Sequence, residues 1–255
     1  MPNNSKGCLI VAFDTAEVCY TKQAIEAANR VVKHLGIPVS IVTDDVSLDT
    51  IYNKIIVERP QNNRRHPRNK PASDWYNLVR TSLYDLSPYE RTLVIDSDFF
   101  ISTDSLLPHL NSSRDFLIAK EIYDLTQGQK KIEKIYSSPI VMYWATVMIF
   151  NKSFEAEAIF DAAKMVESNY KFYANLYGFI ATPIRNDFIF SIACHLIGGY
   201  GIKNYGLVNY PLINCDSKIK YISWKDEKLI YKYNGDACVN RIKNADLHLM
   251  NKVQE

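Results

Sequence analysis

The chain has 255 residues, and its 30 Lys and Arg against 28 Asp and Glu leave a formal net charge of +2. This balance argues against a strongly cationic nucleic-acid coat protein, whose affinity depends on neutralising many phosphates. A hydrophobic fraction of 47% excludes an intrinsically disordered chain, and only 9 glycines argue against Gly-rich repeats and glycine loops that bind phosphate.

The five cysteines are dispersed and form no C-x-x-C pair, which favours reduced thiols in a cytosolic protein. No apolar stretch reaches the ~20 residues of a spanning helix, and the N-terminus lacks the pattern of a signal peptide. We therefore expect a soluble, cytoplasmic protein without a membrane span. Its compact size fits a bacterial cell or a phage-infected host cell.

The first elements follow a β-α-β order. A continuous apolar run at 8–13 predicts a buried strand, 21–35 has helical spacing that ends at Gly36, and 39–42 predicts a second strand. Such units are typical of parallel sheets, and 55–57 is a candidate third strand.

Residues 58–74 are rich in Pro, Asn and Arg and predict a surface loop. Two interpretations of its basic cluster stay open: a solvated loop, or a lid or acceptor clamp that orders over phosphates. A nucleic-acid acceptor would also fit a local basic cluster. The cluster consists of Arg64, Arg65, His66, Arg68 and Lys70.

After the loop, a helix is predicted over 75–86, capped by Ser73 or Asp74. The later predicted elements are strands within 140–150, helices at 154–170 and 186–196, and short strands at 205–208 and 219–224. No linker is visible, so the fold class is a single mixed α/β domain (1–255) with a mostly parallel sheet flanked by helices. We expect a nucleotide-binding half at 1–105 and an acceptor and sugar half at 106–255.

The most informative segment is the apolar strand predicted at 92–95, which ends in Asp96-Ser97-Asp98. Carboxylates at the end of a buried strand cost free energy unless they are paired or bind metal. In open α/β sheets, ligands bind at the carboxyl ends of the strands. Two oxygen ligands at this position suit Mg²⁺ or Mn²⁺ together with a diphosphate, and a solvated strand-end turn is the structural alternative.

Further motifs follow a recognisable order along the chain. They are Val42-Thr43-Asp44, Arg80 before the aspartate pair, Ala145–Asn151 (ATVMIFN), Arg185-Asn186-Asp187, and Asp246-Leu247-His248 followed by Lys252. In this order the chain resembles nucleotide-sugar glycosyltransferases of the GT-A fold, nearest to the family-eight type that includes glycogenin and lipooligosaccharide galactosyltransferases. It departs from the family at Phe188, where the family has Gln, and by the missing Gly between His248 and Lys252.

The resemblance implies a metal and diphosphate site. Asp96, Asp98 and His248 would hold Mn²⁺ or Mg²⁺, and Ser97 and Lys252 would contact the diphosphate. A surface position is the alternative for His248.

The resemblance also implies roles at the nucleoside and the sugar. The residues expected near the base and ribose are Ala12, Phe13, Asp14, Thr15 and Asp44. Arg80 would bridge the phosphates or contact the donor sugar, and Asp187 would contact sugar hydroxyls or lie near the anomeric carbon. The structural alternatives are turn chemistry for Asp44, an ordinary helix-face charge for Arg80 and a helix cap for Asp187.

Together these features predict a metal-dependent glycosyltransferase that moves a sugar from a nucleotide-diphosphate sugar, a UDP-sugar, to an acceptor hydroxyl with retention. The acceptor stays open among glycans, small molecules, proteins and nucleic acids. A non-catalytic nucleotide-sugar-binding or interaction module on the same fold is the main alternative. A haloacid-dehalogenase phosphatase is disfavoured by Phe100, where that pattern has Thr or Val. A sugar nucleotidyltransferase would need a Gly-rich loop after the first strand.

Overall fold

The computed structural model describes residues 5–63, 74–125, 128–215, 219–225, 228–241 and 245–250. Its helices are α1 (Tyr20–Leu35), the 3-10 helix η1 (Leu78–Ser82), α2 (Leu83–Leu86), α3 (Leu107–Leu110), α4 (Phe154–Ser168), α5 (Tyr170–Tyr177) and α6 (Asn186–Ile197). Its strands are β1 (Lys6–Val11), β2 (Val39–Thr43), β3 (Asn53–Ile56), β4 (Arg91–Asp96), β5 (Phe99–Phe100), β6 (Phe116–Ala119), β7 (Glu121–Asp124), β8 (Gln129–Ile132), β9 (Trp144–Asn151), β10 (Leu212–Cys215), β11 (Ile219–Lys225), β12 (Lys228–Tyr233), β13 (Asp236–Arg241) and β14 (Leu247–Leu249).

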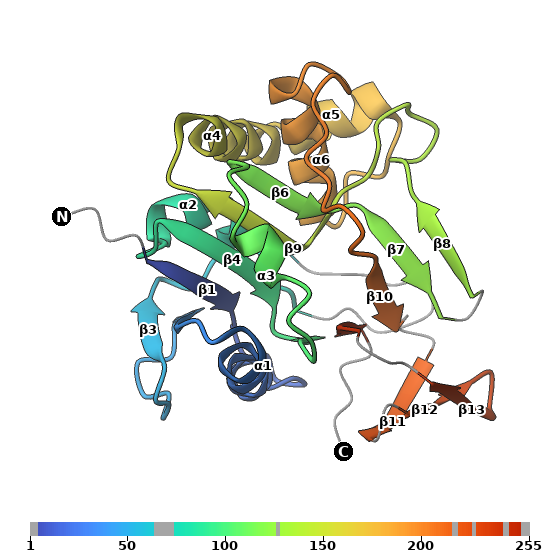
Figure 1. Ribbon diagram of the computed structural model, residues 1–255. Helices are drawn as coiled ribbons and strands as arrows, with labels where there is room; N and C mark the ends of the chain where they lie inside the picture. The colour runs from blue at the N-terminus through green and yellow to red at the C-terminus, as the bar shows by residue number, and fades with distance from the viewer. Residues whose placement is uncertain are drawn as a thin grey trace.

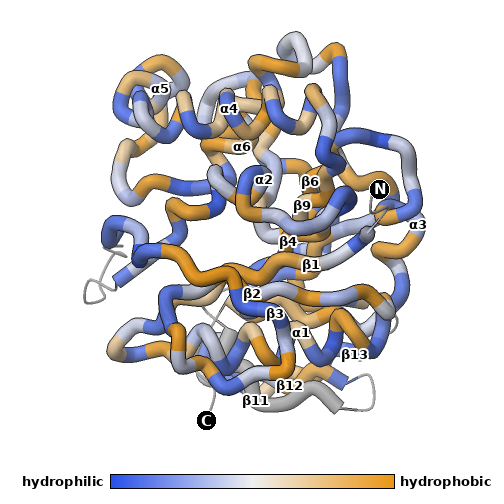
Figure 2. Tube along the Cα trace, turned by 90° about the vertical axis from the view of Figure 1, so that its left-hand side faces the viewer, coloured by the Kyte–Doolittle hydropathy of each residue, from blue (hydrophilic) through white to orange (hydrophobic). Residues whose placement is uncertain are grey.

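A six-stranded sheet in the order β3-β2-β1-β4-β9-β6 forms the centre of the molecule (Figure 1). The strands β3, β2, β1 and β4 are parallel, and β9 runs antiparallel to both β4 and β6. Helices α4 and α6 lie over one face and α1 over the other, so both faces are covered (Figures 1 and 2). The expected mixed α/β class with a mostly parallel sheet is confirmed.

The apolar runs in the sequence match this burial. Leu93, Val94 and Ile95 of β4 are each 0% exposed, because a strand covered on both faces has no solvent-facing side. The helix α1 turns its small side chains to the sheet and ends at Gly36, whose φ of 66° and ψ of 23° lie in the left-handed region. Glycine adopts that conformation at little cost, which is why the helix ends there.

A second, five-stranded sheet has the order β5-β14-β10-β7-β8 and lies beside the carboxyl end of β4. Its strands β7, β10 and β14 are parallel, whereas β5 and β8 are antiparallel edge strands. The strands β11, β12 and β13 form a separate antiparallel meander. The buried residues of this part form a small cluster made of Phe100, Leu125, Cys215, Leu229, Tyr231, Leu247 and Leu249.

Two predicted elements are wrong. The helix expected over 75–86 begins only at Leu78, as a 3-10 turn, and becomes α-helical at Leu83. Residues before it pair with the preceding loop instead, since the Asn63 N–H donates to the Trp75 carbonyl at 2.8 Å and the Trp75 N–H donates to Asn62 Oδ1 at 3.1 Å. These bonds compete with the first helical turn.

The strand expected at 205–208 is also absent. This segment only bridges to Ile118 of β6, which donates to the Tyr205 carbonyl and accepts from the Leu207 N–H, both at 2.9 Å. Asn209 then takes a positive φ of 56°, which turns the chain away before a ladder can form. The helix predicted at 154–170 is present as α4, which ends at Ser168, and α5 follows it as a separate helix. The other predicted elements are present.

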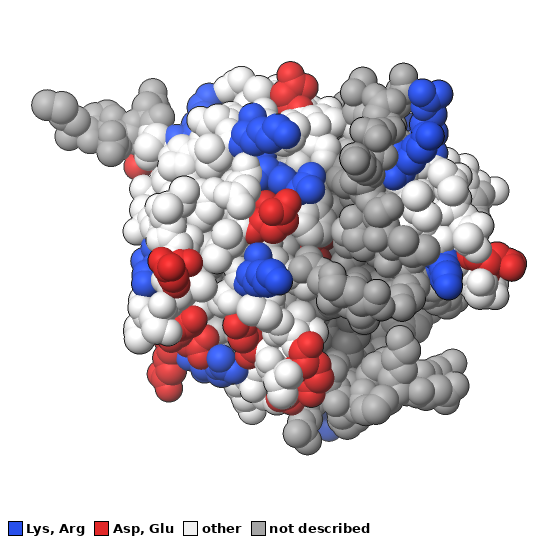
Figure 3. All heavy atoms as spheres, turned by 90° about the horizontal axis from the view of Figure 1, so that it is seen from below, with Lys and Arg blue, Asp and Glu red and all other residues white. Residues whose placement is uncertain are grey.

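The described part of the loop, at 58–63 and Asp74, has no regular secondary structure, and its basic cluster lies outside the described residues. On the face seen from below, the described acidic and basic side chains are interspersed (Figure 3). No helix in the described ranges is long and apolar enough to cross a bilayer.

Candidate functional site

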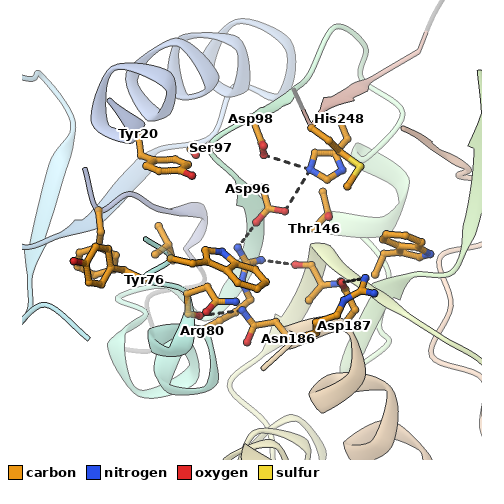
Figure 4. A pocket seen from close by; sticks show the side chains of 18 residues that line it. Tyr20, Tyr76, Arg80, Asp96, Ser97, Asp98, Thr146, Asn186, Asp187 and His248 are labelled. Carbon is orange, nitrogen blue, oxygen red and sulfur yellow. Dashed lines mark hydrogen bonds and ion pairs between the residues drawn. The ribbon is translucent and has the colours of Figure 1, made fainter. Parts of the chain in front are cut away.

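A pocket opens at the carboxyl ends of β1 and β4, where the two sheets meet (Figure 4). It is open to solvent, and about 1020 Å³ of space outside the protein atoms lies within it, open solvent included. Its lining includes Phe13, Tyr76, Asn77, Arg80, Asp96, Ser97, Asp98, Trp144, Ala145, Arg185, Asn186, Asp187 and His248.

Two aspartates and a histidine face one another in this pocket (Figure 4). His248 Nε2 lies 3.3 Å from Asp98 Oδ1 and 3.7 Å from Asp96 Oδ2. Asp98 and His248 are each 6% exposed, and Ser97 between the aspartates is 5% exposed. One ligand atom from each of the three residues lies within 4.8 Å of the others. The surface position considered for His248 is therefore excluded.

Strand pairing brings His248 to the aspartates. β14 pairs with β5, which follows directly after Asp98, and the register places His248 opposite Phe99. The Leu249 N–H donates to the Asp98 carbonyl at 2.9 Å, which continues this pairing to the aspartate itself. A residue near the C-terminus and a strand end in the middle of the chain thus form one site.

Asp246 holds the start of β14 against the segment that follows β5. Its Oδ1 accepts from the N–H groups of Ser102 at 2.7 Å and Thr103 at 3.0 Å, and from Thr103 Oγ1 at 3.1 Å. Its Oδ2 accepts from the Tyr210 hydroxyl at 2.6 Å. Because four donors surround one buried carboxylate, they determine the position of the strand that carries His248.

The donor set fits a divalent cation. Asp96, Asp98 and His248 offer two carboxylate oxygens and one imidazole nitrogen. The oxygens suit both Mn²⁺ and Mg²⁺, and the nitrogen ligand favours Mn²⁺ over Mg²⁺. They are the only group of three or more such side chains so arranged in the described part of the chain. Carboxylates this close to each other repel unless a cation or proton lies between them.

Arg80 fixes the orientation of Asp96. It is 7% exposed, its Nη2 pairs with Asp96 Oδ1 and its Nη1 donates to the Ala145 carbonyl. An ordinary helix-face charge would be exposed, so this alternative is excluded. The ion pair leaves Asp96 Oδ2 directed at His248.

Asp187 lies at the first turn of α6 and faces the same pocket. Its Oδ1 accepts from the Ala145 N–H at 3.0 Å and its Oδ2 pairs with Arg185 Nη2 at 3.0 Å. Its carboxylate therefore connects α6 to β9, and no side-chain cap is formed at the helix start. Arg80 and Asp187 thus hold the carbonyl and the N–H of one residue, Ala145, which belong to its two flanking peptide groups.

Of the residues expected near the nucleoside, one lines the pocket and the others do not. Phe13 lines the pocket. Asp14 instead accepts from the N–H and the hydroxyl of Thr21, both at 2.8 Å, so it binds the first turn of α1. Ala12 and Thr15 are not among the lining residues.

Asp44 is paired with Arg59, a residue that the sequence did not single out. The Arg59 Nε to Asp44 Oδ2 distance is 2.5 Å, and Arg59 Nη1 donates to the Asp14 carbonyl at 2.9 Å. The pKa of Arg59 is raised, first by its hydrogen bond to Asp44. The guanidinium also lies 4.8 Å from the ring centroid of Tyr76, which lines the pocket. Lys252 lies outside the described residues.

Sequence patterns missed other polar groups of the pocket. Asn186 is 8% exposed, donates through Nδ2 to the Asn77 carbonyl at 2.9 Å, and leaves Oδ1 without a protein partner. The indole N–H of Trp144 is likewise buried and without a protein partner. The motif Arg185-Asn186-Asp187 assigned no role to Asn186 itself. Trp144 lies within a predicted apolar strand, where no pattern distinguishes a pocket residue from a core residue.

No protein-family model matches the chain, and no curated protein matches it in sequence. Among solved structures, an active-site mutant of LgtC is 16% identical, and the match covers 82% of this chain and 74% of that chain with a TM-score of 0.50. Mouse xyloside xylosyltransferase 1 is 12% identical over 81% of this chain and 85% of that chain, with a TM-score of 0.47.

The glycosyltransferase GlyE of Streptococcus pneumoniae is 11% identical, and the match covers 80% of this chain with a TM-score of 0.45. The chain spans less than half of GlyE, since 45% of the GlyE chain is covered. LgtC is described as a galactosyltransferase. The likeness to LgtC shows that the chain has the GT-A fold, which the resemblance in sequence predicted.

Proposed function

We propose that this chain is a metal-dependent glycosyltransferase that moves a sugar from a nucleotide-diphosphate sugar, a UDP-sugar, to an acceptor hydroxyl. The observation that carries the proposal is the cluster of Asp96, Asp98 and His248 in a pocket at the carboxyl ends of parallel strands. In α/β sheets this edge is where nucleotides bind. The GT-A fold supports the same function.

Asp96, Asp98 and His248 are the residues that would hold the cation. When bound, a divalent cation neutralises the charge that develops on a diphosphate leaving group. Arg80 contributes by holding Asp96 in one orientation, so that the carboxylate does not reorganise as the donor binds. Ser97 lies between the aspartates, where it can contact a phosphate oxygen.

Asp187 is proposed to contact the donor sugar. Each of its oxygens already accepts one hydrogen bond, and each keeps a further lone pair for a sugar hydroxyl. Because Ala145 and Arg185 fix the carboxylate, it is preorganised for a ligand in the pocket. The unpartnered oxygen of Asn186 lies beside it in the sequence and offers another acceptor. Retention of the anomeric configuration is part of the proposal through the family-eight resemblance.

The first test is a thermal shift of the full chain with UDP and Mn²⁺, separately and together. We expect UDP to stabilise the native protein only when Mn²⁺ is present, because ligands that bind the folded state raise its melting temperature. Asp98→Ala should lose this response, whereas the control Asp85→Ala, at an exposed aspartate on α2, should keep it.

The second test is a panel of nucleotide sugars scored for slow hydrolysis of the donor, which requires no known acceptor. Hydrolysis of one donor in the presence of Mn²⁺ would support a transferase and identify the sugar. Binding of UDP and Mn²⁺ without hydrolysis of any donor would support the non-catalytic module. If neither UDP nor Mn²⁺ changes the melting temperature, the proposed nucleotide-sugar site is contradicted.

A further inference from the structure

The imidazole of His248 has a second contact, on the side away from the aspartates. His248 Nδ1 lies 3.0 Å from Asn214 Oδ1, and both residues are buried, with exposed fractions of 6% and 8%. Figure 4 shows the opposite edge of the ring facing Asp96 and Asp98. The ring is therefore held between an amide oxygen and two carboxylates.

Strand register determines this contact. β10 and β14 are parallel neighbours, and His248 is the register partner of Asn214. β10 lies between β14 and β7, so its backbone is paired on both sides. The Met250 N–H also donates to the Cys215 carbonyl at 3.1 Å, which extends the pairing past the two side chains. The amide group of Asn214 thus stands on a central strand with little freedom to move.

The chemistry of the contact selects one tautomer. A neutral imidazole has one N–H and one lone pair, and an amide oxygen can only accept. With Asn214 Oδ1 as the acceptor, Nδ1 carries a proton, and in the neutral ring that binds a metal the lone pair of Nε2 points at the two carboxylates. A lone pair and two carboxylates directed at one point make a cation site, and histidines that bind metals commonly donate their other N–H to such an oxygen.

We propose that Asn214 is a positioning residue for the metal site. It holds His248 in the Nδ1–H tautomer and fixes the ring so that Nε2 is the ligand atom. This inference rests on the proposed metal-dependent function, and it assigns a role to a strand, β10, that contributes no lining residue to the pocket.

The first experiment measures binding of Mn²⁺ alone to the metal-free full chain, from the electron paramagnetic resonance signal of the free ion. Asn214→Leu removes the acceptor at similar volume and should weaken Mn²⁺ binding by about 10–100-fold, the usual effect of losing such an outer partner. Asn214→Asp keeps an oxygen acceptor and should bind Mn²⁺ at least as tightly as the native chain.

A matched control is Asn151→Leu. Asn151 likewise accepts a hydrogen bond from a buried side chain, Arg91 Nη1 at 2.7 Å, but it pairs with the first residue of β4, at the end of the strand opposite Asp96. This variant should lose stability and keep native Mn²⁺ affinity per folded molecule. If Asn214→Leu keeps native Mn²⁺ affinity, or if Asn214→Asp loses it as Asn214→Leu does, the proposal is overturned.

The second experiment observes the tautomer directly, by ¹⁵N nuclear magnetic resonance of the metal-free protein. We expect Nδ1 of His248 to be protonated in the native chain and this preference to be lost in Asn214→Leu. A neutral ring protonated only on Nε2 in the native chain would overturn the proposal. The two failures are distinguishable: a native chain that binds no Mn²⁺ contradicts the metal-dependent function, whereas the tautomer tests Asn214 without metal.

Discussion

The two sheets that meet at the pocket hold their site residues by different interactions. Asp96 ends a strand whose three preceding residues are fully buried apolar side chains between helices. His248 stands on a three-residue strand that is positioned by Asn214 beside it and by Asp246 two residues before it. The apolar cluster around this strand is small.

The difference teaches how stability and geometry are distributed in the molecule. Apolar burial is nondirectional and scales with area, so the six-stranded sheet supplies much of the folding free energy without specifying an orientation. Buried hydrogen bonds contribute little net free energy, but they are directional and costly to leave unmade. The five-stranded sheet therefore determines where Nε2 of His248 points.

The largest expected effect is on turnover, at the point where the two sheets meet. Asp98→Ala should lower Mn²⁺-dependent release of the nucleoside diphosphate on the order of 10³-fold, because several kcal/mol of charge stabilisation are lost. Circular dichroism should show an intact fold, and the exposed control Asp85→Ala should keep full activity. Normal turnover in Asp98→Ala would contradict the metal assignment.

The next effect separates stability from geometry in the six-stranded sheet. Leu93→Ala, at a fully buried position of β4, should lower the free energy of unfolding by about 2–5 kcal/mol through lost transfer energy and a cavity. Denaturant titration measures this loss. Mn²⁺ affinity of the folded fraction should remain native, and a parallel loss of affinity would show that the two regions are not separable.

A smaller and more local effect is expected in the five-stranded sheet. Asp246→Ala leaves the N–H groups of Ser102 and Thr103 without their acceptor, at about 1–3 kcal/mol for each buried group left unsatisfied. Hydrogen exchange should accelerate at these two amides, and Mn²⁺ affinity should fall. Asp246→Asn keeps an acceptor oxygen and serves as the control. Unchanged exchange and affinity in Asp246→Ala would refute a role for Asp246 in holding β14.

The smallest expected effect is on the melting temperature, and it concerns an ionisable side chain on α4, beside the six-stranded sheet. Burial raises the pKa of Glu167 on α4 above its ordinary value of 4.5, although Thr81 Oγ1 donates to its Oε2 at 2.7 Å. The folded state then binds a proton more readily than the unfolded state, so stability falls as pH rises from the ordinary pKa through the raised pKa, and the loss is complete above the raised pKa. Glu167→Gln should raise the melting temperature at pH 7 and should leave it unchanged below the ordinary pKa of Glu167. An equal rise at both pH values would exclude ionisation of Glu167 as the cause.

Much of the arrangement could be predicted because local patterns carry it. The apolar run before Asp96, the helical spacing that ends at Gly36 and the β-α-β order predict which strands are parallel and which edge binds ligands. The roles assigned to Asp187 and to the nucleoside-side residues remain predictions. The short strands of the second sheet were largely missed, because strands of three or four residues have no measurable period.

The sequence by itself determined the α/β class and the aspartate pair at a strand end, since each depends on residues close together in the chain. Tertiary structure alone decided that Arg80 holds Asp96, that Asp14 binds the start of α1, and that Asn214 contacts His248. These contacts join segments far apart in the sequence, and strand register and helix packing, which depend on the whole core, decide which distant side chains meet.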